Sequence, residues 1–115
     1  MSRRTFQVVL LPEAIQFIED QPTAVGDKIF YNMHRVAAGE MNSELFSKLE
    51  GTEIWEFRTR FQKNAYRLFA FWDTEDETLV VATHGLNKKT QKTPPGEIAN
   101  AERIMKKYFI DKHKK

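Results

Sequence analysis

The chain contains no cysteine, which excludes disulfides, a thiol nucleophile and a cysteine-based zinc site. It also lacks any run close to the ~20 consecutive apolar residues that a membrane helix requires. Its first residues, Met1-Ser2-Arg3-Arg4, are not followed by the continuous apolar stretch of a signal peptide. We therefore expect a cytoplasmic protein with no membrane partner.

The motifs of the common nucleotide-binding and hydrolytic enzymes are absent as well. There is no P-loop, no Gly-x-Gly-x-x-Gly, no His-Glu-x-x-His and no Gly-x-Ser-x-Gly. The three histidines, His34, His84 and His113, are far apart and lack spaced carboxylate partners. We expect neither a metal site nor a cofactor.

The composition is that of one folded domain. The 115 residues fit a single domain spanning 1–115. A hydrophobic fraction of 41% and nine phenylalanines are too apolar for a disordered chain. Such a chain can bury roughly two-thirds of its unfolded surface, which allows one real core.

The hydrophobic pattern alternates between helical and strand periods and predicts an α+β fold in the order β-α-α-β-β-β-α. Two helices form a hairpin that packs on a small antiparallel or mixed sheet of about four strands, and a short run at 45–49 precedes the later strands. Pro12, Pro22 and Gly39 mark helix boundaries. The predicted strands are 5–10, 53–61, 65–73 and 78–86, and the predicted helices are 13–20, 23–38 and one beginning at 94.

The strand at 53–61 alternates cleanly between apolar and charged residues. Trp55 and Phe57 share one face with Phe61, while Glu56 and Arg58 share the other face with Arg60. We expect Trp55 and Phe57 to be buried and Glu56 and Arg58 to reach solvent.

A candidate site follows from the next strand. Arg67 stands in an otherwise aromatic or aliphatic run beside Tyr66 and needs an anion, a carboxylate or water there. If it points the same way as Arg58, two guanidiniums converge beside Glu56, and such a clamp suits a phosphate whose charge grows in the transition state. The alternative is a cross-strand Glu–Arg ladder that keeps the sheet soluble. Spacing alone does not separate the two.

The segment after the last predicted strand is basic. Lys88, Lys89 and Lys92 fall within five residues, and His84 precedes them at the strand end. Residues 88–115 hold nine Lys/Arg against three acids, a local charge of +6, whereas residues 1–87 carry a local −4. This asymmetry favours contact with a polyanion. The alternative is a solvated loop whose lysines serve solubility.

The chain from 45 to 105 resembles the RelE/ParE toxin superfamily and, within it, the phage-derived HigB-like branch. The resemblance covers about half the chain. It is carried by an ordered set of segments: Leu45-Phe46-Ser47-Lys48-Leu49-Glu50-Gly51, Ile54-Trp55-Glu56-Phe57-Arg58, Tyr66-Arg67-Leu68-Phe69, and Lys88-Lys89-Thr90-Gln91-Lys92-Thr93-Pro94 followed by Glu97-Ile98 and Ala101.

The resemblance implies the toxin of a type II toxin–antitoxin module, with a helix-turn-helix antitoxin as its partner. Toxins of the RelE and HigB kind are mRNA interferases that cut messenger RNA on the ribosome, by metal-free attack of a ribose 2′-hydroxyl on the adjacent phosphate. Glu56 falls where the RelE-like pattern has a lysine base, so the general base stays open. By position, Arg58, Arg67, Lys88 and Lys89 match basic residues of RelE-like sites. We therefore expect catalytic roles for Glu56, Arg58, Arg67 and Lys88, and RNA-binding roles for Arg60, Tyr66, His84, Lys89 and Lys92.

Two other functions stay open at this point. One is a ParE-like toxin that inhibits DNA gyrase by binding it and has no nuclease activity. The other is a non-catalytic nucleic-acid-binding or phage structural protein that kept the fold. The cluster of arginines and lysines disfavours the first, because such an inhibitor needs no phosphate clamp. The presence of Arg58 and Arg67 disfavours the second.

Overall fold

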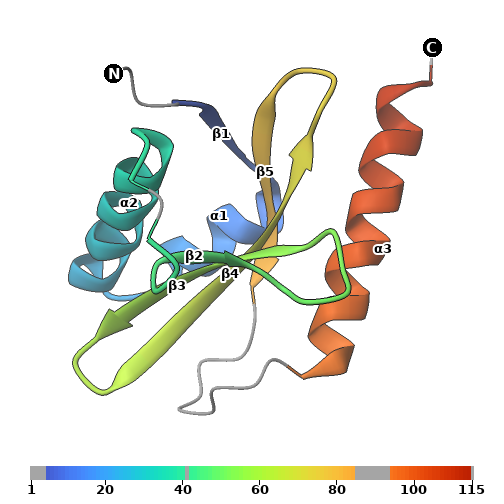
Figure 1. The fold of residues 1–115 in the computed structure, drawn as a ribbon. Coiled ribbons are helices and arrows are strands. Elements are labelled where there is room, and N and C mark those ends of the chain that lie inside the picture. The colour runs from blue at the N-terminus through green and yellow to red at the C-terminus, as the bar shows by residue number, and fades with distance from the viewer. Residues whose placement is uncertain (1–4, 41, 85–93, 115) are drawn as a thin grey trace.

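The computed structural model describes residues 5–40, 42–84 and 94–114. Within these ranges, three helices cover both faces of one five-stranded mixed sheet (Figure 1). None of the helices in this part of the chain is long and apolar enough to cross a membrane. In chain order the elements are β1 (Gln7–Leu10), α1 (Pro12–Glu19), α2 (Thr23–Ala37), β2 (Phe46–Lys48), β3 (Trp55–Phe61), β4 (Asn64–Asp73), β5 (Thr78–His84) and α3 (Pro95–Lys112).

The predicted α+β class and the helical hairpin are confirmed. The order gains one short strand, β2, so the sheet has five strands where about four were expected. β2 is three residues long and pairs only with the first three residues of β3. So short a run carries little of the period-two signal on which strand prediction depends.

The sheet has the order β1-β5-β4-β3-β2. β1 runs parallel to β5, and all the other neighbours are antiparallel. β3 and β4 form a hairpin that turns through Gln62, which adopts a left-handed conformation with φ 57°. This register sets Arg58 directly opposite Arg67 and Thr59 opposite Tyr66.

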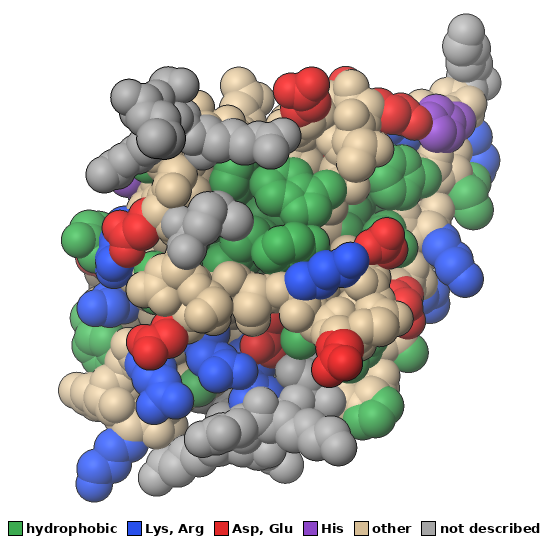
Figure 2. Space-filling view, in the orientation of Figure 1, with side chains coloured by type: hydrophobic (Ala, Val, Ile, Leu, Met, Phe, Trp, Pro, Cys, Tyr) green, Lys and Arg blue, Asp and Glu red, His purple; other side chains and the backbone are tan. Residues whose placement is uncertain are grey.

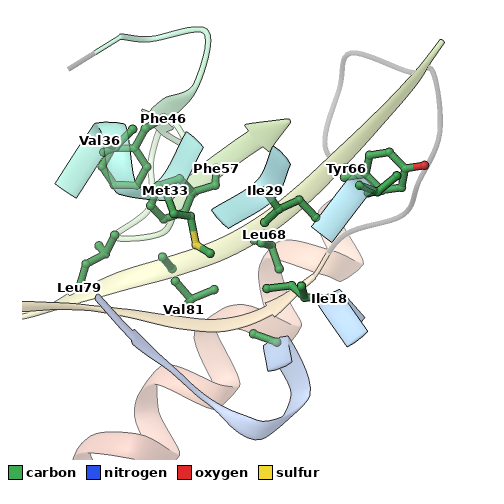
Figure 3. Close-up of a cluster of buried hydrophobic side chains, with 13 residues drawn as sticks. Ile18, Ile29, Met33, Val36, Phe46, Phe57, Tyr66, Leu68, Leu79 and Val81 are labelled. Carbon is green, nitrogen blue, oxygen red and sulfur yellow. The ribbon is translucent and has the colours of Figure 1, made fainter. Parts of the chain in front are cut away.

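α1 and α2 cover one face of the sheet (Figure 3). Pro12 opens α1 and Pro22 precedes α2, positions where a missing backbone N–H costs nothing. α2 stops before Gly39, whose φ of 108° suits a helix end. The buried side chains of this core include Ile18, Ile29, Met33 and Val36 from the helices and Phe46, Phe57, Leu68, Leu79 and Val81 from the strands.

α3 packs on the opposite face, against β4 and β5. Ala101 is fully buried there, and its small side chain lets the helix approach the sheet closely. A second core forms beneath it, made of Ile54, Phe69, Phe71, Val80 and Ala82 with Ala101 itself. Both faces of the sheet are therefore covered over part of their area.

The burial of the charged face of β3 corrects one expectation. Phe57 is buried and Trp55 is half-buried, but Glu56 does not reach solvent, because its exposed fraction is only 2%. The Arg58 side chain is 28% exposed, so it reaches solvent in part. The period-two pattern assigns side chains to the correct face, but it does not reveal that the charged face is partly covered.

The last turns of α3 are anchored on the turn between β4 and β5. The carboxylate of Asp73, which is fully buried, accepts hydrogen bonds from the Tyr108 hydroxyl and the Lys112 ammonium, each at 2.6 Å. Burial disfavours the Asp73 carboxylate, but these bonds outweigh that effect and lower its pKa to about 2. The bond to Asp73, assisted by burial, raises the pKa of Tyr108 to about 12.

Candidate functional site

Glu56, Arg58 and Arg67 form one charged cluster on the α3 side of the sheet. Arg58 and Arg67 are cross-strand neighbours, and Glu56 precedes Arg58 by two residues on the same face of β3. The Arg58 Nη2 atom donates to Glu56 Oε1 at 3.1 Å, and Arg67 Nε lies 3.8 Å from Glu56 Oε2. The predicted convergence of two guanidiniums beside Glu56 is thus present in the structure.

The cluster combines burial with a surplus of positive charge. Arg67 is 1% exposed and Glu56 2%, so both are withdrawn from water. A buried charge is tolerated only when other groups compensate it, and one carboxylate here faces two guanidiniums. The three groups together carry a net positive charge, and Arg58 presents part of it to solvent. An anion such as a phosphate is attracted to that position.

Arg60 extends the same face of β3 by two residues beyond Arg58. Its side chain is exposed. Figure 2 shows Lys and Arg side chains gathered over the lower left part of this view, where Figure 1 places the far end of the β3–β4 hairpin. The positive charge therefore continues from Arg58 through Arg60 toward the far end of the β3–β4 hairpin.

Two predicted RNA-binding residues lie on the other side of the sheet. Tyr66 is 6% exposed and belongs to the core beneath α1 and α2. His84 stacks on Phe17 of α1, with ring centroids 4.3 Å apart and planes 10° from parallel. The structure does not bring either side chain together with Glu56, Arg58 and Arg67, because strand neighbours point to opposite faces.

Lys88, Lys89 and Lys92 lie outside the described residues. β5 ends at His84, which pairs with Leu68, the residue after Arg67. The basic segment thus follows a strand end that neighbours the cluster. Among the described residues, no group of three or more His, Asp or Glu side chains could hold a metal ion.

Sequence reasoning missed a pocket beside the cluster. It has a volume of about 660 Å³ and lies between α2 and the free edge of β3. Lys28, Asn32 and Arg35 line it from α2 at the helical spacing i, i+4 and i+7, which is the signal that could have revealed a shared polar face. Arg58 and Arg60 line it from β3.

Fold and site together define a RelE-like α+β protein with an arginine cluster on its sheet. Residues 16–106 match the phage-derived protein Gp49-like family (DUF891), and the chain belongs to that family. The phage-derived family confirms that part of the predicted resemblance, and the RelE-like part is confirmed for the fold. No curated protein matches the chain in sequence.

Two solved toxin structures share the fold. The isolated RelE toxin of E. coli aligns with a TM-score of 0.56 at 12% identity, over 89% of this chain and 98% of that one. RelE in the archaeal RelE–RelB complex from Pyrococcus horikoshii OT3 aligns with a TM-score of 0.52 at 17% identity, over 76% of this chain and 99% of that one. At such identities the likeness concerns the fold.

Proposed function

We propose that this chain is the toxin of a type II toxin–antitoxin module and that it is a ribosome-dependent mRNA endoribonuclease of the cytoplasm. The RelE-like fold and the Gp49-like family support the toxin assignment. One observation carries the nuclease assignment. Arg58 and Arg67 both face the buried carboxylate of Glu56, and the Arg58 side chain is partly exposed to solvent.

In the proposed reaction, a ribose 2′-hydroxyl of the messenger attacks the adjacent phosphorus. The new bond joins the 2′-oxygen to phosphorus, and the bond from phosphorus to the 5′-oxygen breaks. The products are a 2′,3′-cyclic phosphate and a 5′-hydroxyl end, and the proton lost by the attacking hydroxyl is balanced by one gained at the leaving oxygen. Negative charge grows on the non-bridging oxygens, where fixed cations lower the barrier.

Arg58 supplies such a cation where solvent reaches it, and Arg67 adds positive charge from its buried position beside Glu56. Glu56 holds both guanidiniums in place through its two oxygens and acts here as a positioning residue. Lys88 assists the leaving 5′-oxygen, while Arg60, Lys89 and Lys92 bind the RNA backbone. Tyr66 and His84 face α1 and α2, so any contact they make with RNA would come from that side of the sheet.

The proposed partner in the resting cell is a helix-turn-helix antitoxin. The RelE of Pyrococcus horikoshii was crystallised in a complex with RelB. In the present chain the local charge of +6 after residue 87 would attract an acidic antitoxin segment. Copurification with the product of the adjacent reading frame should yield a tight heterocomplex. Free expression without growth arrest, and without such a partner, would contradict the toxin assignment.

The nuclease assignment is tested by single-turnover cleavage of messenger on programmed ribosomes. Arg58→Ala should lower the rate by about 100-fold or more, because one transition-state cation is lost. Lys48→Ala is the matched control, since Lys48 is an exposed lysine on β2 whose partner is Glu53. Growth arrest that survives Arg58→Ala, together with inhibited gyrase supercoiling, would favour the ParE-like alternative.

A further inference from the structure

We propose that the pocket between α2 and β3 binds one nucleotide of single-stranded RNA, with the phosphate held by Lys28 and Arg60 and the ribose 2′-hydroxyl held by Asn32. The inference deepens the proposed function by adding a second binding position to the same RNA path. It rests on that function for the identity of the strand. Its own support is the geometry of the pocket.

The pocket exists because β2 is short. β2 pairs with β3 only from Trp55 to Phe57, and the Arg58 backbone N–H donates to Leu45 at 2.8 Å just before the two chains part. Beyond that point the edge of β3 is open toward α2. The resulting space of about 660 Å³ is large enough for a nucleotide-sized ligand.

The walls of the pocket carry more positive than negative charge. Lys28 and Arg60 are exposed, and neither makes an ion pair with another described residue. Arg58 contributes from the catalytic cluster, whereas Arg35 is neutralised by its ion pair with Glu40. Glu44 is the one carboxylate among the described residues that line the pocket. The surplus of cations selects an anionic ligand.

Besides the charge of its walls, Asn32 gives an independent indication that the pocket binds a ligand. Its side chain lines the pocket, yet the residue is only 3% exposed. The amide Nδ2 donates to Thr59 Oγ1 at 3.2 Å, which fixes the orientation of the amide. The other amide atom, Oδ1, is buried and accepts no hydrogen bond within the described part of the chain. A buried acceptor without a partner is costly, and a donating ligand reaches Oδ1 when the amide turns toward the pocket, because the atom has almost no exposed surface of its own.

RNA satisfies both requirements at once. Its phosphate matches the cations, and its 2′-hydroxyl is a hydrogen-bond donor that DNA lacks. Arg58 belongs both to the pocket and to the cluster with Glu56, so one continuous strand can occupy both places. Arg60 follows Arg58 at a rise of about 7 Å along β3, which places the second cation one step farther along the same path.

The test is the binding of a short, mixed-sequence single-stranded RNA in the absence of ribosomes, measured by fluorescence anisotropy at several salt concentrations. Lys28→Ala and Arg60→Ala should each weaken binding and reduce the salt slope by about 0.7. The control Lys48→Ala should leave the slope unchanged. If the two pocket variants behave like the control, the pocket does not hold RNA and the proposal is wrong.

The role of Asn32 is tested with DNA of the same sequence. One hydrogen bond to the 2′-hydroxyl should make RNA bind about threefold to tenfold more tightly than DNA. Asn32→Leu keeps a similar volume and should remove this preference, with folding confirmed by the denaturation midpoint. Equal binding of RNA and DNA by the wild type would overturn the assignment of Asn32.

These outcomes are separable from those of the nuclease assay. A protein that cuts messenger normally after Lys28→Ala, with unchanged RNA affinity, contradicts only the pocket, because Lys28 has no part in the proposed nuclease site. A protein that never cuts, yet loses RNA affinity in the two pocket variants, contradicts only the nuclease. If the variants instead weaken the antitoxin complex and spare RNA binding, the pocket receives an acidic protein segment and the RNA proposal fails.

Discussion

At the scale of single residues, the main feature is a carboxylate buried between two guanidiniums. Glu56 is almost fully withdrawn from water and makes ion pairs with Arg58 and Arg67. Removal of one buried partner from such a group leaves a buried charge uncompensated, which lowers the free energy of unfolding strongly. The cluster is therefore part of the folded core as well as a candidate catalytic site.

Arg67→Ala should lower the free energy of unfolding by about 3–5 kcal/mol, because Arg67 and Glu56 are both buried. Arg58→Ala should cost about 1 kcal/mol or less, since its side chain is partly exposed and its ion pair is screened. Urea denaturation measures both values. In the double variant Glu56→Leu, Arg67→Leu, much of the stability should return. Equal costs for the two single variants would show that burial does not distinguish them.

Asp73 and Tyr108 should give the protein a pH dependence at both extremes. The lowered Asp73 pKa means that its stabilising contribution is complete above its ordinary value of 3.8 and is lost as pH falls through about 2. The raised Tyr108 pKa means that its contribution is complete below its ordinary value of 10.0 and is lost as pH rises through about 12.

These two limits can be separated with matched variants and thermal melts across pH. Asp73→Asn should flatten the acid limb relative to wild type, and Tyr108→Phe should flatten the alkaline limb. Both variants should also be less stable at neutral pH, since Tyr108→Phe removes the donor of the 2.6 Å hydrogen bond and Asp73→Asn replaces its charged acceptor by a neutral amide oxygen. Acid and alkaline limbs identical to those of wild type would show that this anchor does not govern the pH response.

Sequence reasoning placed Arg58 and Arg67 on one face correctly, because the side-chain period of a strand is fixed at two. It expected both arginines to be solvated, which is wrong for Arg67, whose exposed fraction is 1%. It could not show that Glu56 is buried, since burial depends on what packs over Glu56's own face of the sheet and not on any local pattern. It also assigned Tyr66 and His84 to RNA from their neighbourhood in sequence. Both lie beneath α1 and α2, on the face opposite the cluster.

At the scale of elements, the two helical layers were predictable to different degrees. Pro12, Pro22 and Gly39 define the hairpin in the sequence, because each residue type restricts or permits particular backbone angles. The parallel pairing of β1 with β5 was not predictable in detail. It joins residues about seventy positions apart, such as Val8 and Leu79, and no local signal specifies such a pair.

α3 should depend on the small side chain of Ala101, which is fully buried against the sheet. Ala101→Leu should destabilise the protein by about 1–3 kcal/mol, because added methyl groups overfill the contact. Ala99→Leu makes the same chemical change at an exposed position of α3 and should stay within about 0.5 kcal/mol of wild type. Chemical denaturation compares the pair. Similar values for both would mean that α3 does not pack closely through Ala101.

At the scale of the whole molecule, one sheet separates two kinds of surface. The hairpin of α1 and α2 closes one face with apolar side chains, and α3 closes only part of the other. The charged cluster lies on that second face, next to the open edge of β3 where the pocket begins. This division allows one fold to keep a stable core and still present fixed cations to a ligand.

The overall family was readable from the sequence because ordered short segments carry it, from 45 to 105. The pocket was not, since it depends on where β2 stops and on how α2 approaches β3. Both features arise from tertiary packing.

The central claim is that this protein cuts RNA by attack of a 2′-hydroxyl on the adjacent phosphate. The most direct measurement maps the cleavage site on a ribosome-bound messenger and then replaces the nucleotide before it with its 2′-deoxy form. We predict that cleavage stops at that site and that the natural product ends in a 2′,3′-cyclic phosphate. Unchanged cleavage of the 2′-deoxy messenger, or products with a 5′-phosphate, would contradict the account.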